Sequence, residues 1–155
     1  MDHGGSNLSA LRIDFVERLG VLAQSEGATR NAGRQFALLA FEGRPMMASE
    51  IMQMLQLGRS SVGTSARFLE DRGMVRRVAR LGERQDRFEL TPTVLTALSK
   101  WLASRRMAAG AEFETIIPAL PEAANDTRHR LAEHARFHRA VEAAISSAQD
   151  GARHP

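Results

Sequence analysis

The 155-residue chain contains no cysteine and no tyrosine, and it has a single tryptophan. Without cysteine, a disulfide scaffold and a thiolate metal site are both excluded. No window approaches the roughly 18 uninterrupted apolar residues that a membrane-spanning helix requires. Residues 1–14 lack an apolar core of signal-peptide length. We therefore expect a cytoplasmic protein that has no membrane partner.

The sequence motifs of several catalytic classes are also missing. There is no cysteine nucleophile, no G-x-S-x-G turn, no H-E-x-x-H pair and no phosphate-binding glycine loop. Neighbouring acids such as Glu70 and Asp71 point away from each other on a helix, so they do not form a general acid and base pair. The sequence predicts a protein that is not an enzyme and that uses no cofactor.

Basic residues are concentrated in one stretch of the chain. Residues 59–87 hold eight arginines and four acids, a net charge of +4, while the whole chain carries +3. The remainder is therefore close to neutral, and the positive charge is local. A concentrated positive patch on a balanced surface predicts a polyanion as the partner.

Apolar residues at helical spacing, interrupted by glycine and proline, predict a mainly helical chain. The expected helices cover residues 8–25, 30–41, 49–55, 59–72, 93–117 and 128–148. Residues 74–81 and 87–90 show the alternation of a β-hairpin, and residues 82–86 form its polar tip. A short helix, a tight turn, a longer helix and a basic hairpin thus follow one another.

The expected helix 59–72 has two different faces. Val62, Ala66 and Leu69 recur at i, i+4 and i+7 and form one apolar stripe. The opposite face carries short polar side chains, arginines and a glycine, namely Arg59, Ser60, Gly63, Thr64 and Arg67. A glycine costs about 1 kcal/mol relative to alanine inside a helix, so its presence predicts close contact with another molecule. A solvated face without a partner is the alternative, and the order of elements favours the contact.

Two runs, IMQMLQLGRSSVGTSARFLEDRGMVRRV (51–78) and GERQDRFELTP (82–92), resemble the winged helix-turn-helix of bacterial MarR-type transcriptional regulators. Within that superfamily the chain is most similar to the GbsR-like branch, and the resemblance covers residues 30–92. It implies a mainly α fold with a small β-hairpin wing, flanked by N- and C-terminal dimerisation helices. It also implies a homodimer that reads a pseudo-palindrome in double-stranded DNA, with each recognition helix in the major groove.

The resemblance suggests which side chains contact DNA. The expected contacts come from Arg59, Ser60, Ser61, Thr64 and Arg67 on the recognition helix and from Arg84 and Arg87 on the wing. Asp86 is expected to orient one of the wing arginines. Three residues depart from the family pattern. Gln56 stands where the turn often has glycine, Gly58 where the helix often has a serine cap, and Val94 where many relatives have a glycine after the wing. Glycine is still an acceptable N-cap.

The same resemblance divides the chain by role. Residues 1–7 are expected to be disordered, 8–29 and 93–149 to form the dimerisation regions, 30–92 to bind DNA and 150–155 to form a tail. The expected dimer contacts are Leu11, Phe15, Leu131, His138, Val141 and Ile145, with Ala135 in the same seam. The alternative is that these helices pack only on their own chain. His134 and His138 also have the spacing of a metal site, but without further ligands a polar part of the seam is favoured.

A small-molecule effector is a further expectation from the resemblance. The GbsR-like branch suggests choline or betaine-like compounds, which need an aromatic cage that this chain does not offer, so that role is not carried over. Met46, Met47, Met52 and Met54 could line an adaptable pocket, although ordinary core packing is the better explanation. The function expected is a DNA-binding repressor, and the alternative is a winged-helix protein-interaction module without specific DNA binding.

Overall fold

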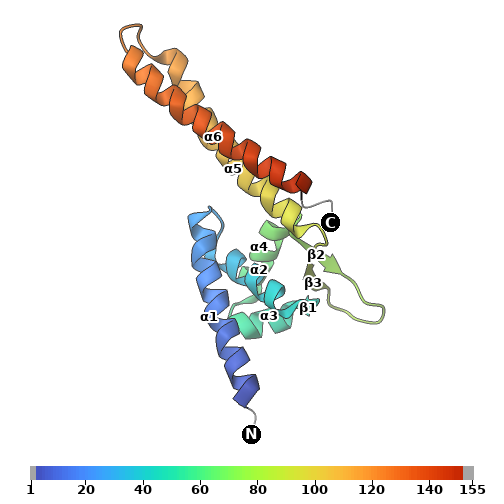
Figure 1. Cartoon of the computed structure of the whole chain (residues 1–155). Coiled ribbons are helices and arrows are strands. Elements are labelled where there is room, and N and C mark those ends of the chain that lie inside the picture. Colours follow the sequence, from blue (N-terminus) through green and yellow to red (C-terminus); the bar gives the residue numbers. More distant parts are fainter. Residues whose placement is uncertain (1–2, 152–155) are drawn as a thin grey trace. The chain divides into compact units, whose positions relative to one another are not determined.

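The computed structural model describes residues 3–151, and its contacts divide the chain into two compact units that meet in sequence at Val94 and Leu95 (Figure 1). The first unit contains α1 (His3–Ser25), α2 (Arg30–Glu42), β1 (Met46–Met47), α3 (Ala48–Leu55), α4 (Arg59–Glu70), β2 (Val75–Val78) and β3 (Arg87–Leu90). The second contains α5 (Val94–Ile116), the 3-10 turn η1 (Ile117–Ala119) and α6 (Asn125–Gly151). The expected class, mainly α with a small β-hairpin wing, is confirmed.

Helices α1 and α2 cross at very short range through glycines. A Cβ atom on Gly33 would lie 2.3 Å from the Ala23 Cβ and 3.1 Å from the Gly20 Cα. Any larger residue at this crossing would push the two helices apart. Helix α2 itself begins where the Thr29 hydroxyl accepts a hydrogen bond from the Ala32 amide, and it ends at Gly43 in the left-handed conformation.

The core of the first unit lies among α2, α3, α4 and the sheet. Its largest fully buried side chains are Leu38, Leu39, Met46, Ile51, Gln35 and Val62. Val62, Ala66 and Leu69, the stripe predicted on α4, are all buried. Because that stripe packs in the core, the opposite face of α4 remains exposed to solvent.

The sheet has three strands in the order β1-β3-β2, all antiparallel. Strand β1 was not predicted, since two residues are too few to show an alternating pattern. It pairs Met46 with Phe88 and Met47 with Arg87. In the hairpin, Val75 lies opposite Leu90 and Val78 opposite Arg87. The first strand is therefore shorter than expected and the tip longer, while the second strand has the expected bounds.

Four helix boundaries differ from the expectation by more than one residue, including the end of α6, which lies at Gly151 instead of residue 148. Helix α1 begins at His3, so residues 3–7 are helical where disorder was predicted. Adding a turn to a formed helix gains one backbone hydrogen bond per residue, which outweighs the poor propensity of glycine. Helix α4 ends at Glu70 instead of residue 72, and α6 begins at Asn125 instead of residue 128. Residues 1–2 and 152–155, part of the expected disordered start and tail, lie outside the described residues.

In the second unit, α5 and α6 run antiparallel as a helical hairpin (Figure 1). A Cβ on Gly110 would lie 3.3 Å from the His138 Cβ, which is tight but less so than the α1–α2 crossing. The Phe113 ring stacks on His134 and His138, with centroids 5.2 and 5.6 Å apart. Trp101, the single tryptophan, lies on α5 with the Arg105 guanidinium 5.8 Å from its ring centroid. Within residues 3–151, no helix is long and apolar enough to cross a membrane.

Candidate nucleic-acid interface

The turn that leads into α4 has an unusual backbone. Helix α3 ends at Leu55, and its C-cap Gln56 has a φ of 53° and a ψ of 47°, which place it in the left-handed region. It is the residue where relatives of the resembled family often have glycine, and among residues 3–151 it is the only non-glycine with positive φ. Gly58 then provides the N-cap of α4 through its backbone alone, and the Val62 amide bonds its carbonyl.

The exposed face of α4 contains most of the predicted DNA contacts. Arg59, Ser60, Thr64 and Arg67 are all exposed, whereas Ser61 is half-buried at the edge of this face. A Cβ built on Gly63 would meet no heavy atom within 4 Å, so open space lies above the backbone there. The structure therefore brings four of the five predicted residues of α4 onto one accessible surface with a bare backbone at its centre.

Free arginines surround this surface. Arg59, Arg67 and Arg84 have no ion pair or hydrogen-bond partner among the described residues. Arg84 is exposed in the loop between β2 and β3, where Gly82 has a φ of 87°. An unpaired guanidinium costs little to transfer to a phosphate or a guanine edge, because no internal ion pair must be broken first.

Arg87 differs from Arg84, because the wing itself neutralises it. Its Nε and Nη2 atoms donate to the two Glu83 carboxylate oxygens at 2.8 and 2.9 Å. This hydrogen bond lowers the pKa of Glu83 and raises that of Arg87. Asp86 itself lies 3.8 Å from Arg77, and Glu83 holds Arg87, so an orienting role of Asp86 toward Arg84 or Arg87 stays a prediction.

Arg77 is a positioning residue that the sequence pattern did not reveal. Its Nε and Nη2 atoms donate to Glu70 at 2.8 and 3.3 Å, and its guanidinium lies 5.3 Å from the Phe88 ring centroid. The hydrogen bond that Arg77 donates to Glu70 is the main reason that the pKa of Arg77 is raised. Together with the Asp86 contact, Arg77 joins the end of α4 to the wing. Glu70 and Arg77 are seven positions apart in the sequence, and only the fold shows that they meet.

A cavity of about 350 Å³ opens between α3, α4 and the wing. It is lined by Ala48, Ser49, Met52, Arg59, Arg77, Gln85, Asp86 and Phe88. The four methionines proposed for an adaptable pocket do not gather here. Met52 lines this cavity, but Met46 is fully buried in the core.

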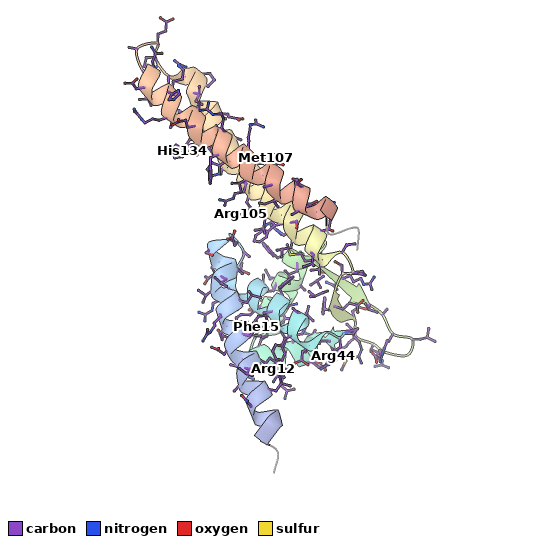
Figure 2. All side chains as sticks on the ribbon, in the orientation of Figure 1. Arg12, Phe15, Arg44, Arg105, Met107 and His134 are labelled. Atoms are coloured by element: carbon purple, nitrogen blue, oxygen red, sulfur yellow. The ribbon has the colours of Figure 1, made fainter. Side chains whose placement is uncertain are left out.

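The predicted dimer contacts fall into two groups. On α1, Leu8, Leu11 and Phe15 are exposed by 57%, 55% and 39%, while Val16 on another face is buried. Figure 2 marks Phe15 on this helix. Leu8 and Leu11 of this stripe therefore remain largely exposed, whereas the Phe15 ring also contacts Phe41 of α2, with ring centroids 5.9 Å apart. An exposed apolar stripe of this kind is typical of a protein interface.

On α6 the expected seam is partly used within the chain. Ala135 and His138 pack on Gly110 and Phe113 of α5, as the alternative in the sequence analysis proposed. Leu131, Val141 and Ile145 are half-buried. His134, marked in Figure 2, stacks on Phe113, and the described residues contain no group of three or more histidine, aspartate or glutamate side chains that could hold a metal ion.

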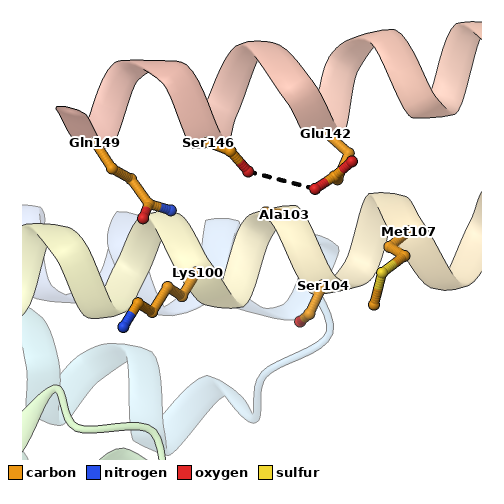
Figure 3. A pocket seen from close by; sticks show the side chains of 7 residues that line it. All are labelled: Lys100, Ala103, Ser104, Met107, Glu142, Ser146 and Gln149. Carbon is orange, nitrogen blue, oxygen red and sulfur yellow. Dashed lines mark hydrogen bonds between the residues drawn. The ribbon is translucent and has the colours of Figure 1, made fainter. Parts of the chain in front are cut away.

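A second cavity, of about 240 Å³, lies along the α5–α6 hairpin (Figure 3). Its walls are formed by Lys100, Ala103, Ser104, Met107, Glu142, Ser146 and Gln149. The Ser146 hydroxyl donates to the Glu142 carboxylate at 3.3 Å, so the polar groups of this cavity partly satisfy one another.

The short helix, the turn, the exposed second helix and the hairpin define the chain as a winged helix-turn-helix protein. It is similar to the HTH-type transcriptional regulator MmpR5 of Mycobacterium tuberculosis (strain ATCC 25618 / H37Rv), with 29% identity over 126 residues, 78% of this chain and 74% of that protein. No family model matches.

Among solved structures, a crystal structure of a transcriptional regulator superposes with a TM-score of 0.74 and 24% identity over 93% of this chain and 99% of that one. MepR, a transcription regulator of the Staphylococcus aureus multidrug efflux pump MepA, superposes with a TM-score of only 0.43 and 16% identity over 80% and 90% of the two chains. That last fit is too loose to support an argument. The relatives are regulators and not enzymes, which fits the lack of catalytic motifs.

Proposed function

We propose that this chain is a transcriptional regulator that binds a specific double-stranded DNA site as a homodimer and acts as a repressor. The observation that carries the proposal is the exposed face of α4, where Arg59, Ser60, Thr64 and Arg67 surround the open backbone of Gly63. Short side chains let the backbone approach a groove, and the arginines bond bases or phosphates. The relative that is named an HTH-type transcriptional regulator supports this function.

The dimer follows from the geometry of DNA reading. One helix and one wing read half a site, and a two-fold dimer reads a pseudo-palindrome. The exposed stripe of Leu8, Leu11 and Phe15 supports a surface on α1 for the second copy. Repression is the simplest outcome, because a dimer on a promoter occludes it.

The effector and the branch of the superfamily belong to the same proposal. Placement near the GbsR-like branch rests on the α4 and wing residues alone, and the choline role of that branch is not extended to a chain with one tryptophan and no tyrosine. A small molecule that modulates the regulator would change its affinity for the selected DNA site, and a panel of ligands added to that binding assay tests this.

The primary test is selection of genomic fragments by the purified protein, followed by binding of the enriched site across a salt series. A two-fold symmetric motif with half-sites about one helical turn apart is the expected result. An interaction module would instead enrich no motif and bind weakly even at low salt. Transcription from the neighbouring promoter, with and without the protein, distinguishes repression from activation.

The wing offers a sharper test of individual contacts. Arg84→Ala should weaken binding to all sequences and flatten the salt dependence by about one unit of slope, because one free phosphate contact is lost. Arg87→Ala should change the slope less, since Glu83 already neutralises that guanidinium. Arg136→Ala is the matched control, an exposed arginine of α6 without a partner among the described residues. If the Arg84 variant kept the wild-type salt slope, Arg84 would make no phosphate contact.

A further inference from the structure

One side chain of α2, Arg34, contacts both α1 and the end of α3. Its Nε donates to Glu17 of α1 at 2.7 Å, and its Nη2 donates to the Leu55 carbonyl at 2.9 Å. Its Nη1 also lies 3.4 Å from the Asn31 side-chain oxygen. The side chain is only 16% exposed, so these bonds are shielded from solvent. Arg34 is therefore a bridge between two elements that are 38 residues apart in sequence at Glu17 and Leu55.

The α1 end of this bridge is built to hold a guanidinium. Glu17 also accepts a hydrogen bond from Arg30 at 2.8 Å. Partial burial by itself would raise the pKa of Glu17, but the hydrogen bonds from Arg30 and Arg34 outweigh it and lower the pKa. A Cβ atom on Gly20 would lie 2.6 Å from the Arg34 Cγ, so the glycine leaves the space through which Arg34 passes.

The other end of the bridge lies at the turn before α4. Leu55 is the last residue of α3, and its carbonyl is one of the helix-end groups that need an external donor. The next residue, Gln56, is left-handed, a conformation that is strained for a residue with a side chain. The Leu57 amide then returns to the Met52 carbonyl at 3.0 Å. The bond from Arg34 fixes the peptide that leads into this strained turn.

We propose that Glu17 and Arg34 are positioning residues that hold the Gln56 turn, so that the placement of α4 for DNA depends on α1. The proposal rests on the DNA-binding function proposed above. It links the helix that carries the exposed stripe of Leu8, Leu11 and Phe15 to the recognition helix through three named hydrogen-bonding groups: the Glu17 carboxylate, the Arg34 guanidinium and the Leu55 carbonyl. Neither residue contacts DNA in this scheme.

The test uses Glu17→Gln and Arg34→Met in the full chain. The matched control is a second α1–α2 pair, Arg12 with Glu42 at 3.0 Å, which is similarly shielded but does not reach the turn. Amide hydrogen exchange at Leu57 and Val62, measured without DNA, reports the turn directly. Affinity for the selected DNA site reports the consequence for α4.

Arg34→Met should speed exchange at Leu57 and weaken DNA binding by roughly 2- to 30-fold, the range of mutations that act through coupling. Arg12→Met should leave both unchanged after correction for global stability. Adding Gln56→Gly to Arg34→Met should restore much of the DNA affinity, because glycine adopts the left-handed conformation without strain. A protein with a merely structural Arg34 would show no such rescue.

If Arg34→Met does not fold, Arg34→Lys serves as a second variant for the same measurements. A lysine retains the charge but lacks the fork that reaches Glu17 and Leu55 together, so exchange at Leu57 should still rise. Unchanged exchange at Leu57, or equal losses in the Arg12 and Arg34 variants, would overturn the proposal. Faster exchange in a protein that binds no DNA site would overturn only the proposed function.

Discussion

Among the described residues, the first unit buries fourteen hydrophobic side chains, whereas the buried hydrophobic residues of the second unit are Ala103 and Ala135. No large apolar side chain of the second unit is buried within residues 95–149, and Leu95, Met107, Ile116 and Phe137 are each about half exposed or more. A two-helix hairpin has one contact face and cannot enclose a core. The first unit therefore encloses a core of its own, whereas the second leaves apolar surface exposed that the proposed dimer would cover.

The largest expected difference between the units is in the cost of truncating a leucine. Leu38→Ala removes a fully buried side chain of the first unit and should lower the free energy of unfolding by about 2–5 kcal/mol. Leu98→Ala, at a half-buried position of α5, should cost clearly less at low protein concentration. Urea unfolding followed by circular dichroism measures both. Equal costs would show that the second unit has a core of its own.

The glycines at the two helix crossings test the same difference between the units, and the effects expected on stability are of intermediate size. Gly33→Ala places a Cβ 2.3 Å from Ala23 and against backbone atoms, so it should destabilise the protein by about 1–3 kcal/mol. Gly110→Ala meets His138 at 3.3 Å, and the better helix propensity of alanine, about 1 kcal/mol, should offset that contact. Thermal unfolding of the two variants measures both changes in stability. A destabilised Gly110 variant would mean that α5 and α6 are as rigidly packed as α1 and α2.

Gly63 separates stability from function within the first unit. Because nothing lies near its missing Cβ, Gly63→Ala should raise the free energy of unfolding by up to about 1 kcal/mol through helix propensity. The same methyl group lies on the proposed DNA face, so affinity for the selected site should fall. Unfolding and DNA binding are measured on the same preparation. Unchanged affinity would show that no ligand approaches the α4 backbone closely.

The pH dependence of the free energy of unfolding is the smallest expected effect, and it also differs between the two units. The backbone amide of Met47 bonds Glu50 at 2.7 Å and is the main cause of its lowered pKa, which burial opposes and Arg44 reinforces. Stability from Glu50 is therefore present above the ordinary glutamate pKa of about 4.3 and is lost as the pH falls through the lowered folded-state value.

Glu50→Gln should thus flatten the loss of stability as the pH falls below about 5, measured by urea unfolding. In the second unit, the pKa of Glu114 is lowered by the hydrogen bond from Arg139, but that pair is exposed. Glu114→Gln should consequently leave the loss of stability at low pH almost unchanged in physiological salt. The reverse order of effects would contradict the contrast between a shielded and an exposed pair.

The sequence predicted the elements whose signals are local. The stripe of Val62, Ala66 and Leu69 is buried as expected, because i, i+4 spacing fixes a helix face regardless of distant contacts. The boundaries of α2 and the start of α4 were also predicted within a residue, since glycine, proline and capping residues act on the adjacent backbone.

The sequence pattern could not predict contacts between residues that are distant in the chain. Strand β1 exists because β3 offers a free edge, and the partners of Arg77 and Arg34 are chosen by the fold. The periodic stripe of α1 was assigned correctly to a helix, but periodicity could not tell whether its partner is the same chain or a second one. The DNA contacts themselves stay predictions, although four of the five residues on α4 share one exposed face.

Trp101 on α5 has a practical consequence for all of these measurements. Since the chain contains one tryptophan and no tyrosine, its intrinsic fluorescence originates almost entirely in the second unit. Circular dichroism, in contrast, records the helices of both units. A single unfolding experiment with both signals therefore observes the two halves separately without any label, and transitions that fail to coincide would show the units melting independently.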